Sequence, residues 1–427
     1  MLVDIRPFRA IRYTEKAGSL KNLVTQPYDK INQDMQREYY EKSPYNYCRL
    51  ILPMEENRYQ AVHQRIYEWM SERILSKDEV PSVFVCCQEF KLNGKNYTRT
   101  GLIAALRLYS YSEGVVFPHE TTYSAPKADR LNMLRTIQKD LEPVFLIYSD
   151  PEKLTVNFFD EITKEPPTIE VEDQLQVKHK MWQVSDPQKI RVLQKALEKK
   201  TMVITDGHHR YESALSYRDE RRLQDECTED AAFNFHMSYM VPVQDEGLVI
   251  LPAHRLLRKF ELTQPILNEM KNYFEISELQ PSVEAVEKYL VHNKKEHAFC
   301  VYTGTKALGL RLTDEEKILQ ITNSSGNLPE VRLLDVVILR DVIFKSIMKL
   351  GELKIDEDIL YERSTRVAME KVASGEAKVA FLLNSINPEV IWRIAQKRQR
   401  LPEKSTDFYP KPVSGLVMMD IARGEKL

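Results

Sequence analysis

The chain has 427 residues, which is too long for one hydrophobic core because single cores stop growing at roughly 250–300 residues. Two or three domains are therefore expected. Its 61 basic and 63 acidic residues leave a net charge of −2, so the composition does not indicate a nucleic-acid partner, which would favour a basic excess. The five cysteines contain no C-x-x-C pair and indicate buried thiols in a reducing compartment.

Targeting and membrane signals are not apparent in the sequence. No stretch approaches the roughly 18–20 apolar residues that a membrane-spanning helix needs. Near the N-terminus, Asp4 and Pro7 interrupt the apolar run that a signal peptide requires. The sequence therefore predicts a soluble, cytoplasmic protein without a membrane partner.

Residues 1–112 are expected to form a small N-terminal α+β domain. An amphipathic helix is predicted from Arg58 to Ser76, where apolar residues recur at helical spacing. Two apolar runs, Val83–Leu92 and Tyr97–Tyr109, flank Asn93-Gly94, a tight-turn signal that predicts a hairpin.

Residues 113–257 and 258–427 are expected to form two further domains. In the central domain we expect strands at Val115–Pro118, Pro143–Tyr148 and Thr201–Thr205, and helices at Lys127–Asp140, Pro187–Lys199 and from the start of the 206–210 segment to about Gln224. In the C-terminal α+β domain we expect helices at Gln264–Asn272, Val283–His292, Val331–Leu350 and Arg363–Ser374, and strands at Ala298–Thr303, Leu308–Leu312 and Lys378–Asn384.

The segment from Asp206 to Arg210 follows a β-branched strand and opens a helix. Such a turn presents free backbone N–H groups and the positive end of a helix dipole at one point, where anions bind. His208, His209 and Arg210 add side-chain donors, and a guanidinium can hold a phosphate through two parallel hydrogen bonds. Gly207 stands in the turn itself. The segment predicts a phosphate site.

Two other interpretations of this segment stay open. Asp206 could serve only as the N-cap of the helix, with the histidines as ordinary polar residues of its first turn. Asp206, His208 and His209 could instead bind a metal ion, although adjacent helical residues point about 100° apart and do not converge on one ion by themselves.

A second segment, Pro118-His119-Glu120, comes directly after a predicted strand. Lys127 and Arg130 follow at the head of the next helix. A carboxylate placed after a strand and close to cations is a candidate general base or metal ligand. The alternative is that Glu120 and Arg130 form a surface ion pair.

A third segment lies near the C-terminus. Lys404, Ser405 and Thr406 are followed by Lys411 and then by a glycine, all within a dozen residues. Hydroxyls and lysines so close together are typical of a lid over a polar ligand, and a surface loop can have the same composition.

These three segments, together with Arg6-Pro7-Phe8 and Pro27-Tyr28-Asp29, resemble a bacterial and archaeal family known as domain-of-unknown-function family 1015. The resemblance runs over nearly the whole chain, and the family name implies no activity. Within it, Gly207-His208-His209-Arg210 through Ala214 resembles the G-x-H-R-x-x-x-A phosphate-binding pattern of the ParB and sulfiredoxin-like superfamily. That resemblance covers about a third of the chain and implies a central mixed α/β domain between the flanking α+β regions.

The superfamily contains DNA-binding partition proteins, sulfiredoxins and kinases of free serine. Sulfiredoxins have a reactive cysteine where this chain has His208, so their chemistry is not expected here. Partition proteins need a DNA-reading domain, for which we find no basic segment. The chain resembles the free serine kinases in its Pro-His-Glu string and its G-H-x-R-type motif, while its long N- and C-terminal regions are departures.

The sequence and the resemblance together predict a phosphotransferase that acts on a small hydroxylated metabolite such as free serine. ATP or ADP would be the donor and Mg²⁺ the bridging ion, since phosphoryl transfer needs positioning, charge neutralisation and a carboxylate for the hydroxyl proton. Glu120, Asp206 and His208 are the catalytic candidates. The residues expected to bind phosphate or nucleotide are Gly207, His208, His209, Arg210, His119, Lys127, Arg130, Lys404, Ser405, Thr406 and Lys411.

Two other functions are compatible with the same residues. One is a nucleotide-sensing or nucleic-acid-associated binding module without turnover. The other is a metal-dependent hydrolase that uses Asp206, His208, His209 and Glu120. The metal ligands, the acceptor and the oligomeric state do not follow from the sequence.

Overall fold

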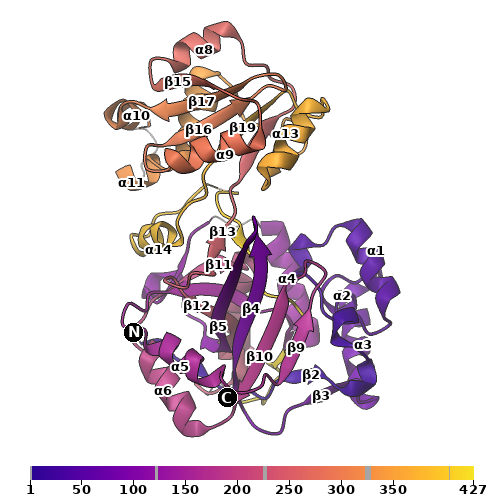
Figure 1. Cartoon of the computed structure of the whole chain (residues 1–427). Coiled ribbons are helices and arrows are strands. Elements are labelled where there is room, and N and C mark those ends of the chain that lie inside the picture. The colour runs from indigo at the N-terminus through magenta and orange to yellow at the C-terminus, as the bar shows by residue number, and fades with distance from the viewer. Residues whose placement is uncertain (1, 121–123, 225–227, 323–327, 403) are drawn as a thin grey trace. The chain divides into compact units, whose positions relative to one another are not determined.

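The structure is a computed structural model, and it describes residues 2–120, 124–224, 228–322, 328–402 and 404–427. The chain forms two compact units, each a mixture of helices and strands (Figure 1). Unit 1 comprises residues 1–249 and 410–427, and unit 2 comprises residues 250–409. The last 18 residues thus return to the unit that contains the N-terminus, which the expected C-terminal domain of residues 258–427 did not anticipate.

Unit 1 is built on a nine-stranded mixed sheet in the order β6-β11-β8-β12-β5-β4-β10-β9, with β1 paired to β5 (Figure 1). The pairs β6/β11 and β8/β12 are parallel and the other pairs are antiparallel. The strands are β1 (Ile5–Arg6), β4 (Val83–Leu92), β5 (Lys95–Arg107), β6 (Val116–Pro118), β8 (Val144–Tyr148), β9 (Ile169–Glu172), β10 (Lys178–Val184), β11 (Met202–Asp206) and β12 (Phe235–Pro242).

The helices of unit 1 pack around this sheet, with α1, α2 and α3 gathered at one side of it (Figure 1). They are α1 (Gln33–Lys42), α2 (Cys48–Ile51), α3 (Arg58–Ser71), α4 (Ser124–Ile137), α5 (Leu154–Ile162), α6 (Pro187–Leu197) and α7 (His208–Gln224). Helices α2, α3 and α4 bury their apolar faces in one core, which includes Leu50, Val62, Trp69, Met133 and Ile137.

Local conformation explains where two predicted elements turn or end. The predicted hairpin of β4 and β5 is confirmed, and its turn residues Asn93 and Gly94 have φ of 49° and 80°. Both values suit the mirror-image turns that match the twist of the strands. Helix α3 ends at Ser71 and not at Ser76, because Arg73 adopts a left-handed φ of 58° and the following residues form β3 (Leu75–Lys77), which pairs with β2 (Ile11–Tyr13).

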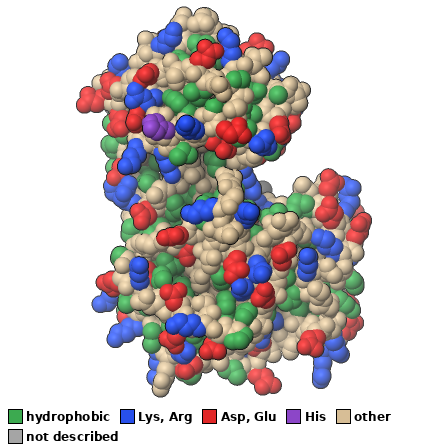
Figure 2. Space-filling view, in the orientation of Figure 1, with side chains coloured by type: hydrophobic (Ala, Val, Ile, Leu, Met, Phe, Trp, Pro, Cys, Tyr) green, Lys and Arg blue, Asp and Glu red, His purple; other side chains and the backbone are tan. Residues whose placement is uncertain are grey.

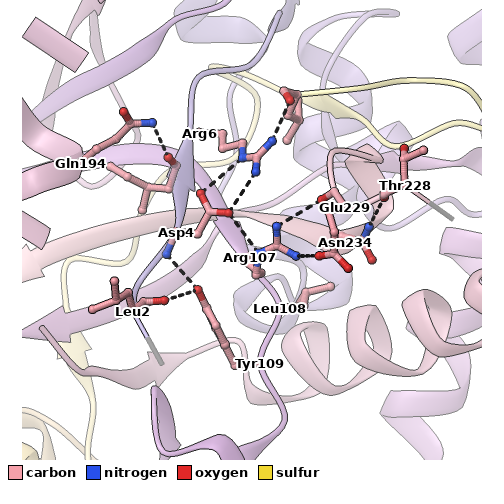
Figure 3. Close-up of polar contacts among 12 residues, drawn as sticks. Leu2, Asp4, Arg6, Arg107, Leu108, Tyr109, Gln194, Thr228, Glu229 and Asn234 are labelled. Atoms are coloured by element: carbon pink, nitrogen blue, oxygen red, sulfur yellow. Dashed lines mark hydrogen bonds and ion pairs between the residues drawn. The ribbon is translucent and has the colours of Figure 1, made fainter. Parts of the chain in front are cut away.

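A polar network fixes the N-terminal strand to the sheet (Figure 3). Arg107 at the end of β5 donates to Asp4 at 3.0 Å and to Glu229 at 2.7 Å. Tyr109 accepts from the amide of Asp4 and donates to the carbonyl of Leu2.

The expected domain boundary near residue 112 falls inside unit 1, between β5 and β6 of the same sheet.

The C-terminal stretch of unit 1 is held by three other segments. Ser414 pairs with Thr25, Met418 pairs with Ile11, and β21 (Met419–Asp420) pairs with β7 (Lys139–Asp140). Its buried apolar residues are Val413, Leu416, Val417, Met418, Met419 and Ile421. These residues contribute to the core of unit 1. A lid role for the preceding 404–411 segment stays a prediction.

Unit 2 contains a six-stranded antiparallel sheet in the order β15-β17-β16-β19-β14-β18. Its strands are β14 (His254–Leu257), β15 (Phe274–Leu279), β16 (Ala298–Tyr302), β17 (Ala307–Leu312), β18 (Ile359–Glu362) and β19 (Val379–Leu383). Its helices are α8 (Gln264–Met270), α9 (Val283–His292), α10 (Glu315–Ile321), α11 (Pro329–Arg332), α12 (Asp335–Val337), α13 (Thr365–Ala373) and α14 (Pro388–Gln396). The expected boundary near residue 257 falls at the end of β14.

The single helix predicted for Val331–Leu350 is wrong. Helix α11 ends at Arg332, because Leu334 is extended with ψ of 135°, and α12 begins after it. A π-helical segment, η7 (Ile338–Ile347), follows directly. Apolar periodicity did not reveal this break, since each of the three pieces contains buried apolar residues.

The near-neutral charge and the lack of long apolar stretches in the sequence are both reflected in the structure. Over the face shown in Figure 2, acidic and basic side chains are interspersed. In the described part of the chain, no helix is both long enough and apolar enough to cross a bilayer.

Candidate active site

A strand, a glycine turn and a helix form the centre of the candidate site. All five residues of β11 are buried, and α7 begins at His208, two residues after Asp206 ends the strand. Gly207 has a φ of 88°, a conformation that side-chain-bearing residues rarely adopt. A Cβ atom there would also lie 3.0 Å from Cζ of Arg210. The turn therefore needs glycine both for its backbone angle and for the close approach of the guanidinium.

Asp206 binds two cations that come from different parts of the chain. Nη2 of Arg210 lies 2.6 Å from Oδ2, and Nζ of Lys411 lies 2.5 Å from Oδ1. All three side chains are buried. Burial acts to raise the pKa of Asp206, but the charges of Lys411 and Arg210 outweigh it and hold the pKa well below its ordinary value. Asp206 is therefore ionised, and its two oxygens are each occupied by a cation.

The guanidinium of Arg210 is held in place on two sides. Nη1 donates to the carbonyl of Pro143 at 2.5 Å, and Nη2 donates to Asp206. Its Nε is buried and has no hydrogen-bond partner among the described residues. Two of its five N–H groups are thus in use, and the two-bond phosphate grip expected for Arg210 stays a prediction.

His119, Glu120 and His208 lie together beside this cluster. The ring centroids of His119 and His208 are 4.8 Å apart, and the amide of His119 donates to Nε2 of His208 at 3.3 Å. Nδ1 of His119 lies 2.5 Å from the carbonyl of Ile204, so it carries a hydrogen and donates to that oxygen. Its Nε2 lies 3.6 Å from Oε1 of Glu120. The parallel pair β6/β11 brings both motifs to the same edge of the sheet.

The charges in this second group follow from burial and neighbours. Burial acts to raise the pKa of Glu120, but the adjacent His119 and further charges at His208 and Lys411 lower it to about 2. Burial and the neighbouring His119 lower the pKa of His208 to about 3. At neutral pH, Glu120 is therefore an ionised carboxylate and His208 a neutral imidazole. The side chain of Glu120 remains 24% exposed, so a solute can reach it.

His209 and Lys30 complete the immediate surroundings. Burial lowers the pKa of the half-buried His209. Lys30, which the sequence analysis did not select, is close enough for its charge to lower the pKa of Asp206. The signal that could have found Lys30 is its place directly after the Pro27-Tyr28-Asp29 string.

Lys127 and Arg130 both lie on α4, and each contacts residues outside the Asp206 cluster. Nζ of Lys127 lies 3.4 Å from Glu212. Arg130 donates to Asp129 at 2.9 Å through Nε and lies over the ring of Tyr28 at 4.2 Å. Their expected contribution to phosphate binding stays a prediction, as does the alternative ion pair of Arg130 with Glu120.

The C-terminal residues that were expected to bind phosphate divide between the two units. Lys411 belongs to unit 1 and reaches Asp206, whereas Lys404, Ser405 and Thr406 belong to unit 2. Ser405 is buried and donates to the carbonyl of Pro402 at 2.5 Å, and Lys404 is exposed with a φ of 55°. A role for these three residues in phosphate binding stays a prediction.

Glu142 is a buried carboxylate of this region that the sequence analysis missed. Its Oε1 accepts from the amide of Tyr28 at 3.1 Å and from the hydroxyl of Ser414 at 2.9 Å. Burial raises its pKa, although Arg210 and Arg130 act in the opposite direction. Its place between Leu141 and Pro143, just before a buried strand, is the only sequence signal for it.

The residues present fit a phosphate group better than a metal ion held by side chains alone. Lys411, Lys30 and Arg210 supply positive charge beside the first turn of α7, whose leading N–H groups have no acceptor within the helix. Among the described residues, no group of three or more His, Cys, Asp or Glu side chains is placed to hold a metal. A magnesium ion would therefore depend on phosphate oxygens and water for most of its ligands.

Fold and site together define a mixed α/β protein with a charged strand–turn–helix site at one edge of its large sheet. Residues 5–337 match the family described as "Protein of unknown function (DUF1015)", and the chain belongs to this family. Comparison with curated proteins gives no match.

Several solved structures are distantly similar to this chain. Free serine kinase in complex with AMP is 14% identical, with a TM-score of 0.32 over 69% of this chain and 83% of that chain. A conserved hypothetical protein from Pyrococcus furiosus is 14% identical, with a TM-score of 0.31 over 69% and 87%. SbnI with C-terminal truncation from Staphylococcus aureus is 8% identical, with a TM-score of 0.33 over 72% and 84%. At these values the similarity carries no functional conclusion.

Proposed function

We propose that this protein is a nucleotide-dependent phosphotransferase that acts on a small hydroxylated metabolite such as free serine. The observation that carries the proposal is the arrangement at the end of β11. There Lys411 and Arg210 lie within 2.6 Å of Asp206, next to the first turn of α7. Phosphoryl transfer requires mainly such fixed positive charge around the phosphates.

Glu120 is the proposed general base. It is ionised and partly exposed. It also lies near the Asp206 cluster, because the charge of Lys411 helps to lower its pKa. A base that takes the proton from an acceptor hydroxyl must be ionised before it reacts.

ATP or ADP would bind with its phosphates at the first turn of α7, close to Lys411 and Lys30. When bound, Mg²⁺ would neutralise part of the phosphate charge. Asp206 keeps Lys411 and Arg210 in fixed positions, so the positive charge is in place before the nucleotide arrives. Preorganised charge of this kind needs no rearrangement during the reaction.

The test uses the full chain in two stages. Thermal shifts with ATP, ADP, AMP and GTP, each with and without Mg²⁺, identify the nucleotide. Conversion of that nucleotide is then followed with pooled amino acids and with pooled sugars. We expect conversion that depends on one acceptor pool. Nucleotide binding without any conversion would instead support a binding module, and activity that depends on Zn²⁺ or Mn²⁺ without nucleotide would support a hydrolase.

A further inference from the structure

Lys411, which pairs with Asp206, stands between two prolines, Pro410 and Pro412. A proline ring fixes its own φ, and it also restricts the residue before it to extended conformations. Neither proline has a backbone N–H to donate. Pro410 and Lys411 are buried, so their carbonyl groups need hydrogen-bond donors. The stretch is therefore stiff, and donors from other parts of unit 1 must hold it.

Gln88 on β4 and Arg99 on β5 supply these donors. The two residues stand directly opposite each other in the β4/β5 hairpin, and both are buried. Nε of Arg99 donates to Oε1 of Gln88 at 3.1 Å. Nη2 of Arg99 donates to the carbonyl of Pro410, and Nε2 of Gln88 donates to the carbonyl of Lys411 at 3.1 Å. One pair of side chains thus holds two consecutive carbonyl groups.

The chemistry of this pair determines how the amide of Gln88 is oriented. A guanidinium has only donors, so the Gln88 atom that faces Arg99 must be the carbonyl oxygen. The amide nitrogen then faces Lys411 and donates to its carbonyl. An ionised carboxylate at position 88 would still accept from Arg99, but it could not donate to Lys411. The contact with Lys411 therefore depends on the amide.

The other partner of the Lys411–Asp206 ion pair also adjoins Arg99. The guanidinium carbon of Arg99 lies 4.8 Å from the centre of the Phe145 ring. Phe145 is the β8 residue that pairs with Asp206 on β11, and its carbonyl accepts from the hydroxyl of Thr205 at 3.0 Å. Arg99 therefore contacts both the backbone next to Lys411 and the strand that is paired with Asp206.

We propose that Gln88 and Arg99 are positioning residues that hold the ammonium group of Lys411 at the proposed phosphate site. The inference rests on the proposed function, in which Lys411 contributes positive charge beside the nucleotide phosphates. A lysine side chain is long and flexible, so its ammonium group is well positioned when its backbone is fixed and its head is paired. Gln88 and Arg99 fix the backbone, and Asp206 pairs with the head.

Chemical labelling measures the position of Lys411 without any nucleotide. With the full chain, acetylation of Lys411 by acetic anhydride is followed by peptide mass spectrometry. Gln88→Met removes the donor to the Lys411 carbonyl, so the rate should rise roughly 3- to 10-fold, the equilibrium factor of one neutral hydrogen bond. Glu89→Gln, the next residue of β4 and in a more exposed pair with Lys180, is the matched control and should leave the rate unchanged. An unchanged rate in Gln88→Met would overturn the proposal.

A mutant cycle on nucleotide binding separates positioning from a general effect on stability. ATP with Mg²⁺ is titrated into each folded variant by calorimetry. Gln88→Met should weaken binding roughly 3- to 10-fold when Lys411 is present and have no further effect in the Lys411→Met background. A residue that only stabilises the fold would change the affinity equally in both backgrounds or in neither. Either of these results would refute the positioning role.

Failure of the proposed function has a different signature. If neither ATP nor ADP binds the wild-type chain, the phosphotransferase proposal fails, and the labelling rates alone decide whether Gln88 positions Lys411. If Gln88→Met does not fold, Gln88→Glu replaces it at about pH 8, where a carboxyl beside a guanidinium is ionised. This variant keeps the acceptor for Arg99 and loses the donor to Lys411. A wild-type labelling rate in Gln88→Glu would equally overturn the proposal.

Discussion

Nζ of Lys411 lies 2.5 Å from Oδ1 of Asp206, although 205 residues separate them in the sequence. The contact joins the C-terminal stretch of unit 1 to the start of α7. Both side chains are buried, so the ion pair is shielded from water and salt. Neither residue could stay buried and charged without the other or a substitute.

A double-mutant cycle should detect this coupling. Lys411→Met leaves Asp206 with Arg210 alone, so we expect a loss of about 1–3 kcal/mol in the free energy of unfolding by urea. Asp206→Asn combined with Lys411→Met should cost less than the sum of the single changes. As a control, Lys180→Met breaks the more exposed pair with Glu89 and should cost at most about 1 kcal/mol. Strictly additive losses would show that the buried contact contributes no coupling.

Arg210→Ala should weaken nucleotide binding by about 1.5–3 kcal/mol, the range of a hydrogen bond to a charged group. The change removes positive charge beside α7 and releases Asp206 from one of its two cations. Calorimetric titration of the nucleotide provides the measurement, after circular dichroism confirms folding. Arg135→Ala, in an exposed pair with Glu220, is the control. Unchanged affinity in folded Arg210→Ala would exclude a phosphate site that depends on this guanidinium.

Glu120→Gln should bind nucleotide normally and lose roughly 10²–10⁴-fold in turnover, the usual span for a general base. Glutamine has the same size and can hydrogen-bond, but it cannot accept the proton. Initial rates at saturating nucleotide measure the effect. Wild-type turnover would show that another group is the base. Loss of magnesium dependence or of folding would indicate that the carboxylate is a ligand or a structural partner.

Gly207→Ala and Gly18→Ala form a matched pair. Both glycines have a φ near 90°, so each alanine carries a backbone strain of about 1–3 kcal/mol. Only at Gly207 does the new Cβ meet atoms within 4 Å, namely the guanidinium of Arg210 at 3.0 Å. That group is held by Asp206 and Pro143 and cannot easily move. Thermal unfolding should show a larger loss for Gly207→Ala, and equal losses would contradict this packing argument.

Stability should depend on pH through His208. Its pKa is lowered from 6.5 to about 3 in the folded chain, so the unfolded chain binds more protons between these values. The stabilisation is fully present above pH 6.5 and falls as the pH decreases toward 3, with a slope of about 1.4 kcal/mol per pH unit. Urea unfolding between pH 6.5 and 5 should therefore show a shallower slope for His208→Gln. Parallel slopes would mean that His208 titrates normally.

The sequence by itself determined the local elements around the site. β-Branched residues from Met202 to Thr205, a glycine and a polar helix start were sufficient to predict the strand and the turn before α7, because these signals act over a few residues. The Asn93-Gly94 hairpin could be predicted for the same reason. The broken helix at Leu334 did not, since an extended residue between apolar turns leaves the periodicity intact.

Only the tertiary structure decided which charges meet. Lys411 and Lys30 lie far from Asp206 in the sequence, and only the folded chain brings them beside it. Glu142 has no motif around it, and only the folded chain buries it close to the charges of Arg210 and Arg130. Arg210 has the sequence of a phosphate ligand, yet the fold directs its terminal nitrogens to Asp206 and the carbonyl of Pro143. Local propensity acts along the chain, whereas ion pairing and desolvation depend on distances that only packing determines.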